Sequence, residues 1–320
     1  MRKMNSLPYI TREAVIKRSA LFSWAIVRAF LIAGISFIIL YPLITKISRS
    51  FMQVQDIYDM TVRYFPKNFT LRNFELIWIW MDLPQTFFNT TGISLIVGIC
   101  QTISATIVAY GFARYKFKGS SLLFSLVIIG MVIPPDVVLV PLYLQFKSFD
   151  IFGLIGMISG TGQGLNLSGG FWPFILLGLT CTGLKNGLYV FLMRQYFLGM
   201  PKELEEAAFV DGAGSIKTFI RIMIPGAIPM MVTVFLFSYV WQWLDVMFSS
   251  VFLNDIKVMT ISLSSLGFVN DMMSMGVSDA VEITLAKYAG IILLILPLVV
   301  VYIFCQRFFV QSVERSGLVG

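Results

Sequence analysis

The 320-residue chain is 57% hydrophobic and only 13% charged, whereas a soluble domain carries about 25% charged residues. Its formal net charge is +7, but the basic residues stand between long uncharged runs and not on a polar domain, which argues against nucleic-acid binding. The composition therefore indicates a membrane protein and excludes a single soluble core.

Several residue patterns that carry chemistry are missing from the sequence. It contains no histidine, which is the commonest general base and metal ligand. Its cysteines, Cys100, Cys181 and Cys305, stand singly in apolar runs, which favours buried small side chains. No Walker A string and no carboxylate cluster with metal-ligand spacing occurs. We expect no catalytic and no metal site, and energy from a partner chain or an ion gradient.

Six runs are long enough to cross a bilayer, which takes about 20 apolar residues in a helix. They are Trp24–Thr45, Phe87–Ala113, Ser121–Phe146, Phe171–Met193, Pro229–Leu253 and Tyr288–Gln306. The pair Pro134-Pro135 is expected to kink the third. The predicted fold is all-α, a polytopic membrane bundle of six transmembrane helices.

Basic residues set the predicted orientation. Lysine and arginine are more frequent before the first run, between the second and third, between the fourth and fifth, and in the tail than on the other side. Because cytoplasmic segments carry this excess, we expect both termini to be cytoplasmic. The predicted division is a cytoplasmic segment 1–23, a first transmembrane helix 24–45, an extracytoplasmic loop 46–86, a core 87–306 with five helices and a cytoplasmic loop 200–228, and a cytoplasmic tail 307–320.

The loop 200–228 has a strong local pattern. Pro201 precedes acidic residues suited to the first turn of a helix, namely Glu203, Glu205 and Glu206. Two alanines, Ala207 and Ala208, would let another protein approach this helix closely, as in a helix-in-groove contact. Asp211-Gly212 is a turn signal, at which Gly212 is expected to have a positive φ.

A second, amphipathic helix is expected after the turn. Ser215 is predicted to cap it and Pro225 to end it. Its apolar stripe has helical spacing and comprises Ile216, Phe219, Ile220, Met223 and Ile224.

These residues resemble a known motif. The string Glu206-Ala207-Ala208, three residues, Gly212, nine residues, Ile222, one residue, Ile224-Pro225 is similar to the EAA loop of binding-protein-dependent ABC importer permeases, with Ile224 in place of the usual leucine. The resemblance implies a coupling helix that docks into a groove on a cytoplasmic ATPase. The coupling residues so implied are Glu205, Glu206, Ala207, Ala208, Asp211, Gly212, Ile222 and Pro225.

The resemblance extends over about 87–320 and is nearest to the carbohydrate-type, MalG-like permeases. It includes Tyr110-Gly111-Phe112-Ala113-Arg114, Ile133-Pro134-Pro135 and Gln306-Arg307-Phe308-Phe309-Val310. It implies a multi-pass protein of the bacterial inner membrane, a second homologous permease, two ATPases that bind ATP and Mg²⁺, an extracytoplasmic solute-binding protein and a sugar substrate. The tail and Trp241-Gln242-Trp243-Leu244-Asp245 depart from the family pattern, which leaves the solute open.

Ionisable and aromatic residues inside the spans are candidates for the substrate path, because intramembrane charges usually face a bundle interior or a water-filled path. The candidates are Asp136, Trp241, Trp243 and Asp245, with Lys185 as a further ionisable residue. Each has an ordinary alternative. Asp245 and Lys185 could lie at the interface, and the tryptophans could belong to the aromatic belt.

Three rival functions remain open. An ion-coupled secondary transporter would show inverted repeats, and an intramembrane enzyme would need a catalytic set within the spans; neither is evident in the sequence. An ABC importer for a non-sugar solute is the third. A neighbouring ATPase gene would separate the importer from the first two.

Overall fold

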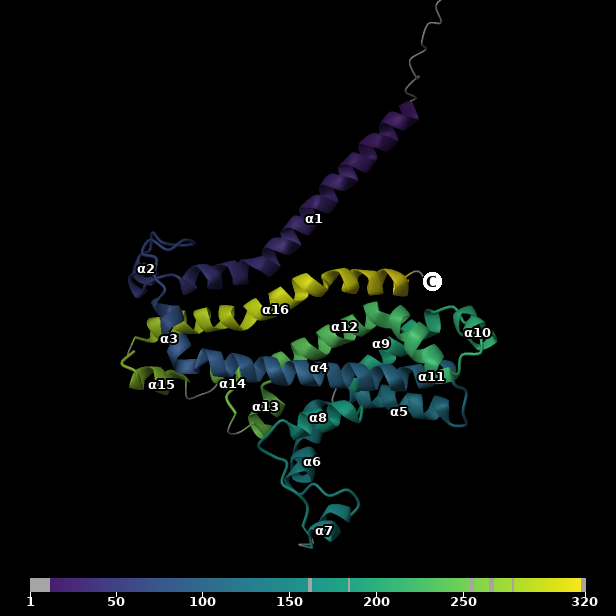
Figure 1. The fold of residues 1–320 in the computed structure, drawn as a ribbon. Helices are drawn as coiled ribbons and strands as arrows, with labels where there is room; N and C mark the ends of the chain where they lie inside the picture. The colour runs from purple at the N-terminus through teal and green to yellow at the C-terminus, as the bar shows by residue number, and fades with distance from the viewer. Residues whose placement is uncertain are drawn as a thin grey trace, which may run out of the picture. The chain divides into compact units, whose positions relative to one another are not determined.

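The computed structural model describes residues 12–160, 163–183, 185–253, 256–264, 268–277 and 279–317; for 12–20, Ser159 and 312–317 only the backbone is described. Within these ranges the chain is helical, apart from isolated bridges of Met52 with Phe69 and of Phe149 with Leu165 (Figure 1). The all-α prediction is confirmed. The outer parts of the two predicted terminal segments, 1–11 and 318–320, lie outside the described residues.

The described residues fall into two compact units, one within Met1–Phe74 and Asp279–Ala289 and the other within Glu75–Ser278 and Gly290–Gly320. The helices in chain order are α1 (Arg12–Ser50), α2 (Val54–Tyr58), α3 (Arg72–Met81), α4 (Leu83–Arg114), α5 (Ser120–Val132), α6 (Pro135–Lys147), α7 (Leu154–Ser159), α8 (Trp172–Leu179), α9 (Asn186–Gly199), α10 (Glu203–Val210), α11 (Ser215–Thr218), the π-helical turn η1 (Phe219–Met223), α12 (Ile224–Trp243), α13 (Met247–Phe252), α14 (Met259–Ser264), α15 (Phe268–Ser274) and α16 (Ala280–Gly317).

Four described helical segments are long and apolar enough to cross a membrane: Leu21–Ser50, Leu83–Arg114, Ser215–Trp243 and Ala280–Gln311. The pair α5 and α6 passes the same test together but is bent by 102°, so the kink expected in the third span is present and is a sharp bend between two helices. Pro134 and Pro135 stand at the bend, where neither can donate a backbone hydrogen bond. By length and composition the chain has four candidate spans, or five if the bent pair counts as one.

The predicted span Phe171–Met193 was wrong as one helix, because a break separates α8 from α9. Cys181 has a left-handed φ of 60°. Its N–H donates to Gly178 at 3.3 Å, and that of Thr182 donates to Leu177 at 3.1 Å. This is the Schellman ending, in which the left-handed position is usually glycine. Hydropathy does not detect such a break, because it depends only on residue type and the residues around the break are mostly apolar.

The predicted span Pro229–Leu253 was wrong at both ends. Its helix runs continuously from Ser215 and stops at Trp243, and α13 is separate. The Asp245 carboxylate accepts the backbone N–H of Ser249 at 2.7 Å, which satisfies a free donor in the first turn of α13. Asp245, which stands between two apolar runs, therefore stabilises the start of α13.

The second unit is built around α4, which lies along α9, α12 and α8 (Figure 1). Small residues on α4, including the fully buried Ala105 and Ala109, allow the close contact. Buried residues from α9 and the η1–α12 segment complete this core: Tyr189, Val190, Met193, Tyr196, Phe197, Met223, Ala227, Met230 and Val234. A second core gathers around Phe252 and includes Phe146, Phe174 and Phe248.

In the first unit, polar contacts hold the segment between α1 and α3. The buried Asn73 donates through Nδ2 to the carbonyls of Ser50 at 2.9 Å and Met52 at 3.0 Å. Arg72 and Glu282 form an ion pair at 2.7 Å. Hydrogen bonds and an ion pair within this unit therefore hold its chain segments together.

Candidate functional site

The loop 200–228 folds as a short helix, a tight turn and a second helical piece. The helix α10 ends at Val210, and the turn closes when Gly212 donates to Phe209 at 3.0 Å. Gly212 has a φ of +78°, which confirms the expected left-handed conformation, and no other residue comes within 4 Å of where its Cβ would be. A side chain at this position would be strained by its backbone and not by crowding.

The second helix differs from the prediction at both ends. It begins at Ser215, but Gly214 is the capping position and no side chain caps it, so the Ser215 cap was wrong. Pro225 does not end the helix either. The turn η1 precedes it, and Ile224 donates to Phe219, five residues back. A π-type turn shifts the hydrogen-bonding pattern just where a proline would interrupt it, so the helix continues into α12.

The eight residues of the EAA-like motif divide between the surface and the interior. Five are exposed: Glu206, Ala207, Asp211, Gly212 and Pro225. The backbone N–H of Glu206 donates to Lys202 at 3.1 Å, but within the described residues the Glu206 carboxylate makes no hydrogen bond or ion pair. Glu205 and Ala208 are buried, and Ile222 is half-buried.

Large apolar side chains surround the exposed part of the motif. Val210 at the end of α10 is 88% exposed and Ile216 in the second helix is 76% exposed, so these apolar side chains are not covered by their own chain. An open hollow runs beside the second helix, lined by Gly214, Ser215, Ile216, Lys217, Ile220 and Arg221. These residues form one surface of mixed apolar and basic character, which we call the docking surface (Val210, Gly214–Lys217, Ile220 and Arg221, with exposed Ala207).

Glu205 faces the interior and meets residues of α4. Its Oε2 lies 2.9 Å from Arg114 Nε, and its Oε1 accepts the Tyr110 hydroxyl at 2.6 Å. Arg114 also donates through Nη2 to the carbonyl of Met200 at 2.8 Å. The sequence pattern alone does not pair these residues, although a basic residue at the end of a span together with an acidic loop is a signal for an ion pair.

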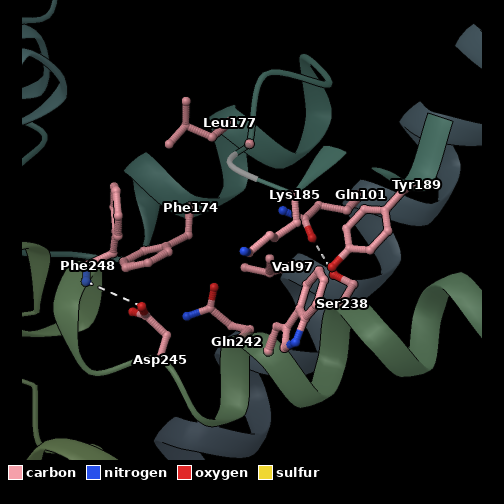
Figure 2. A pocket seen from close by; sticks show the side chains of 12 residues that line it. Val97, Gln101, Phe174, Leu177, Lys185, Tyr189, Ser238, Gln242, Asp245 and Phe248 are labelled. Atoms are coloured by element: carbon pink, nitrogen blue, oxygen red, sulfur yellow. Dashed lines mark hydrogen bonds between the residues drawn. The ribbon is translucent and has the colours of Figure 1, made fainter. Parts of the chain in front are cut away.

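A small cavity of about 100 Å³ lies inside the second unit between α4, α8, α9 and α12. Apolar side chains such as Val97 and Phe174 form part of its wall. Figure 2 shows the side chains of Lys185 and Gln242 extending into it from two different helical segments, with Asp245 nearby. Trp241 and Asp245 were expected in a substrate path, and the structure places both at this cavity together with Lys185.

The polar groups of the cavity are only partly satisfied. Lys185 Nζ lies 4.7 Å from the centre of the Trp241 ring and has no ion pair among the described residues. The Gln242 amide nitrogen is buried, with no hydrogen-bond partner in the described chain. Asp245 is engaged with Ser249. The cavity thus offers a cation and an amide donor to an acceptor-rich molecule.

The other two predicted path residues lie elsewhere. Trp243 is fully buried, and its indole N–H donates to the carbonyl of Leu294 at 3.1 Å, which is a packing role. Asp136 is exposed on α6 and does not line the cavity. Within the described ranges, no three histidine, cysteine, aspartate or glutamate side chains gather closely enough to hold a metal ion.

A family model described as "Binding-protein-dependent transport system inner membrane component" matches residues 101–315, which is more than half of the chain and contains the docking surface and every residue that lines the cavity except Val97. The chain belongs to this permease family. It is the membrane-spanning subunit of a binding-protein-dependent ABC importer, a transport component and not an enzyme.

Two relatives of this permease are similar to it in sequence over most of their own length. The arabinooligosaccharides transport system permease protein AraQ of Halalkalibacterium halodurans is 29% identical over 310 residues, which cover 95% of this chain and 99% of AraQ. The osmoprotective compounds uptake permease protein GgtD of Synechocystis is 30% identical over 239 residues, 74% of this chain and 70% of GgtD.

One solved structure has the same fold. It is the crystal structure of a bacterial ABC transporter involved in the import of the acidic polysaccharide alginate, and one of its chains matches with a TM-score of 0.64 at 20% identity. The match covers 95% of this permease and all of that chain.

Proposed function

We propose that this permease imports a sugar or oligosaccharide delivered by an extracytoplasmic binding protein. The observation that carries the proposal is the cavity, in which the Lys185 ammonium has no ion pair and the Gln242 amide nitrogen no hydrogen bond among the described residues, and both face aromatic and apolar walls. Apolar walls with a few placed donors are typical of solute sites, and the space of about 100 Å³ would take one part of a solute, with its hydroxyl oxygens as acceptors. Relatives named for arabinooligosaccharides and for melibiose, raffinose and stachyose support the same class.

A second solute class has a specific observation in its favour, since GgtD is named for osmoprotective compounds. Calorimetry of the cognate binding protein against an oligosaccharide panel and a set of small osmolytes decides between them. We expect binding to an oligosaccharide. Binding to osmolytes alone would replace the sugar proposal with the non-sugar one.

The proposed energy source is a pair of cytoplasmic ATPases that bind ATP and Mg²⁺, with a second homologous permease completing the membrane part. The docking surface supports this, because an exposed apolar patch beside basic residues suits a protein partner. The exposed Glu206 would face that partner. ATP-driven closure of the ATPases would then move α10 and α11 and switch the side to which the permease is open.

The proposed topology has six crossings with both termini in the cytoplasm. The bent pair α5–α6 would make the third crossing and the broken pair α8–α9 the fourth. Broken helices are tolerated at membrane depth where they line a cavity, and Lys185 at the start of α9 lines one.

Reporter fusions test the topology. Fusions within Arg114–Gly119 and at Asn270 are expected to report opposite sides of the membrane, the first cytoplasmic, because basic residues concentrate in the first segment. Alkaline phosphatase and fluorescent-protein reporters measure this directly. If both sites report the same side, six crossings are wrong.

Substitutions test the cavity. Lys185→Met and Gln242→Leu each remove a donor, and each is expected to raise the half-saturation concentration for uptake by about 10-fold or more, as loss of a hydrogen bond to a ligand would. Uptake by vesicles containing the whole transporter measures this. Asp136→Asn is the matched control, because it neutralises an intramembrane charge outside the cavity. Normal uptake by the two cavity variants would place the solute elsewhere.

A further inference from the structure

Three residues link α10, which carries part of the docking surface, to the membrane helix α4 through buried polar contacts. Arg114 and Glu205 have side chains only 6% and 10% exposed, with Arg114 Nε 2.9 Å from Glu205 Oε2. Tyr110 adds a hydrogen bond of 2.6 Å to the other carboxylate oxygen. We call Tyr110, Arg114 and Glu205 the clasp.

We propose that the clasp transmits the movement of α10 to the walls of the cavity, a role that rests on the proposed docking of α10 and α11. Tyr110, Arg114 and Glu205 are then positioning residues that determine how far ATPase movement reaches the transport path. The buried Glu205 is assigned to this internal joint, and contact with the ATPase is left to its exposed neighbours.

The first support is that α4 connects the clasp directly to the cavity. Tyr110 and Arg114 lie in the last turns of α4, and the same helix contributes Val97 and Gln101 to the cavity wall. At 1.5 Å per residue, Gln101 and Tyr110 are about 14 Å apart along one unbroken helix. A helix without a break transmits a displacement of its end with little loss.

The second support is that the clasp also reaches α9. The Arg114 guanidinium donates to the carbonyl of Met200, which follows the last residue of α9. The first turn of α9 and its capping position bring Tyr189 and Lys185 to the cavity. The helices α4 and α9, which both line the cavity, are therefore connected through the Arg114 guanidinium. The same guanidinium contacts the Glu205 carboxylate on α10.

The third support is the incomplete geometry of the ion pair. Arg114 Nε lies close to Glu205 without hydrogen-bond alignment, and Nη1 is buried with no partner among the described residues. A buried ion pair stabilises a fold only when its geometry is excellent and its remaining donors are hydrogen-bonded, and this pair does not meet that condition. Here the guanidinium keeps a spare donor, so it can exchange partners as α10 moves without leaving the carboxylate unpaired.

The experiment uses the whole transporter in vesicles with its binding protein. The triple variant Tyr110→Phe/Arg114→Met/Glu205→Leu removes all three polar groups together, so that none of them is left unpaired in the interior. We expect assembly with the ATPase and basal ATP hydrolysis within about twofold of the parent, while stimulation by loaded binding protein and uptake fall about 10-fold or more, within the usual range of coupling energies. Glu203→Gln, an exposed change on the same helix, is the control and is expected to keep both.

The unfolding midpoint of the purified complex adds a readout that separates coupling from stability. The triple variant leaves no buried charge, so it is expected to lower stimulation while its midpoint stays near that of the parent. Glu205→Gln keeps the shape and an acceptor for Tyr110 but leaves Arg114 without its counter-ion, so it is expected to lower the midpoint as well. Normal stimulation and uptake in the triple variant would overturn the proposal. Loss of ATPase assembly in the triple variant would also overturn it, because the clasp would then serve only to present the docking surface.

A separate variant shows whether a negative result counts against the clasp or against the proposed docking of α10 on the ATPase. Ala207→Trp alters the exposed side of α10 and leaves the clasp intact. If Ala207→Trp keeps full assembly and stimulation, docking through α10 is wrong whatever the clasp variants do. If Ala207→Trp disrupts docking while the triple variant behaves as the parent does, only the clasp is wrong.

Discussion

Ala207→Trp is expected to release the ATPase from the permease while the membrane helices still insert. Ala207 is exposed in the middle of α10, beside the apolar docking surface. A groove that accepts a small side chain has no room for an indole ring, so the helix would be held out of contact. Ala208 is buried against its own chain and is unsuited to this test, because enlarging it would disturb the fold.

The measurement is co-purification of the ATPase together with stimulated hydrolysis in vesicles. We expect both to fall to near background. Ala207→Ser is the control, since serine keeps the small volume, and it is expected to behave as the parent does. Full assembly and stimulation by Ala207→Trp would remove the main support for docking through 203–225.

Gly212→Val provides an independent change in the same loop. The positive φ of Gly212 strains a β-branched residue by about 1–2 kcal/mol, so the direction of α11 is expected to change although no atom is crowded. Gly212→Asn is the comparison, because asparagine adopts this conformation more readily. Reduced stimulation with valine and normal stimulation with asparagine is the expected pair of results.

Gly187→Val is expected to cause the largest loss of folded permease. A Cβ at Gly187 on α9 would lie 2.7 Å from Met131 Cγ and 3.0 Å from the carbonyl oxygen of Val127 on α5. The second contact is with backbone, so α5 itself must move, and overpacking of this kind costs about 1–3 kcal/mol. Small residues at such crossings let membrane helices pack closely.

The test is the thermal unfolding midpoint and the yield of the solubilised transporter. Gly130→Val is the matched control on α5, because nothing lies within 4 Å of where its Cβ would be. We expect Gly130→Val to keep a normal midpoint and Gly187→Val to lower both midpoint and yield. Equal midpoints for the two variants would mean that α5 and α9 are not packed as described.

The sequence predicted the helices whose apolar character is continuous, because a long uninterrupted apolar run has the length and composition of a membrane span whichever surface it contacts. For this reason Leu21–Ser50, Leu83–Arg114 and Ala280–Gln311 contain predicted spans. Hydropathy says nothing about backbone direction. The end of α8 at Cys181, where glycine is usual, could not be predicted from it.

The sequence predicted the conformation of the candidate site only where residues close together in the chain determine it. The turn at Gly212 is local, and its positive φ followed from the residue type. The pairing of Glu205 with Arg114 joins residues far apart in the sequence, so it depends on how α10 packs against α4. Trp241 and Trp243 are about 200° apart around α12. One of them therefore faces the cavity while the other is buried, and hydropathy does not reveal which.

The π-helical turn at Phe219–Met223 has a consequence for the phase of the two helical pieces that it joins. A π turn contains one more residue than the α-helical turn that it replaces. Deleting a single residue there would allow regular α-helix throughout, but everything before it would rotate by about 100° and shift by about 1.5 Å relative to α12. Ile216 and Lys217 would then point in a different direction with every side chain still present. The direction in which this permease presents its docking surface is thus set by the number of residues in one turn, and sequence changes that preserve that number preserve the direction.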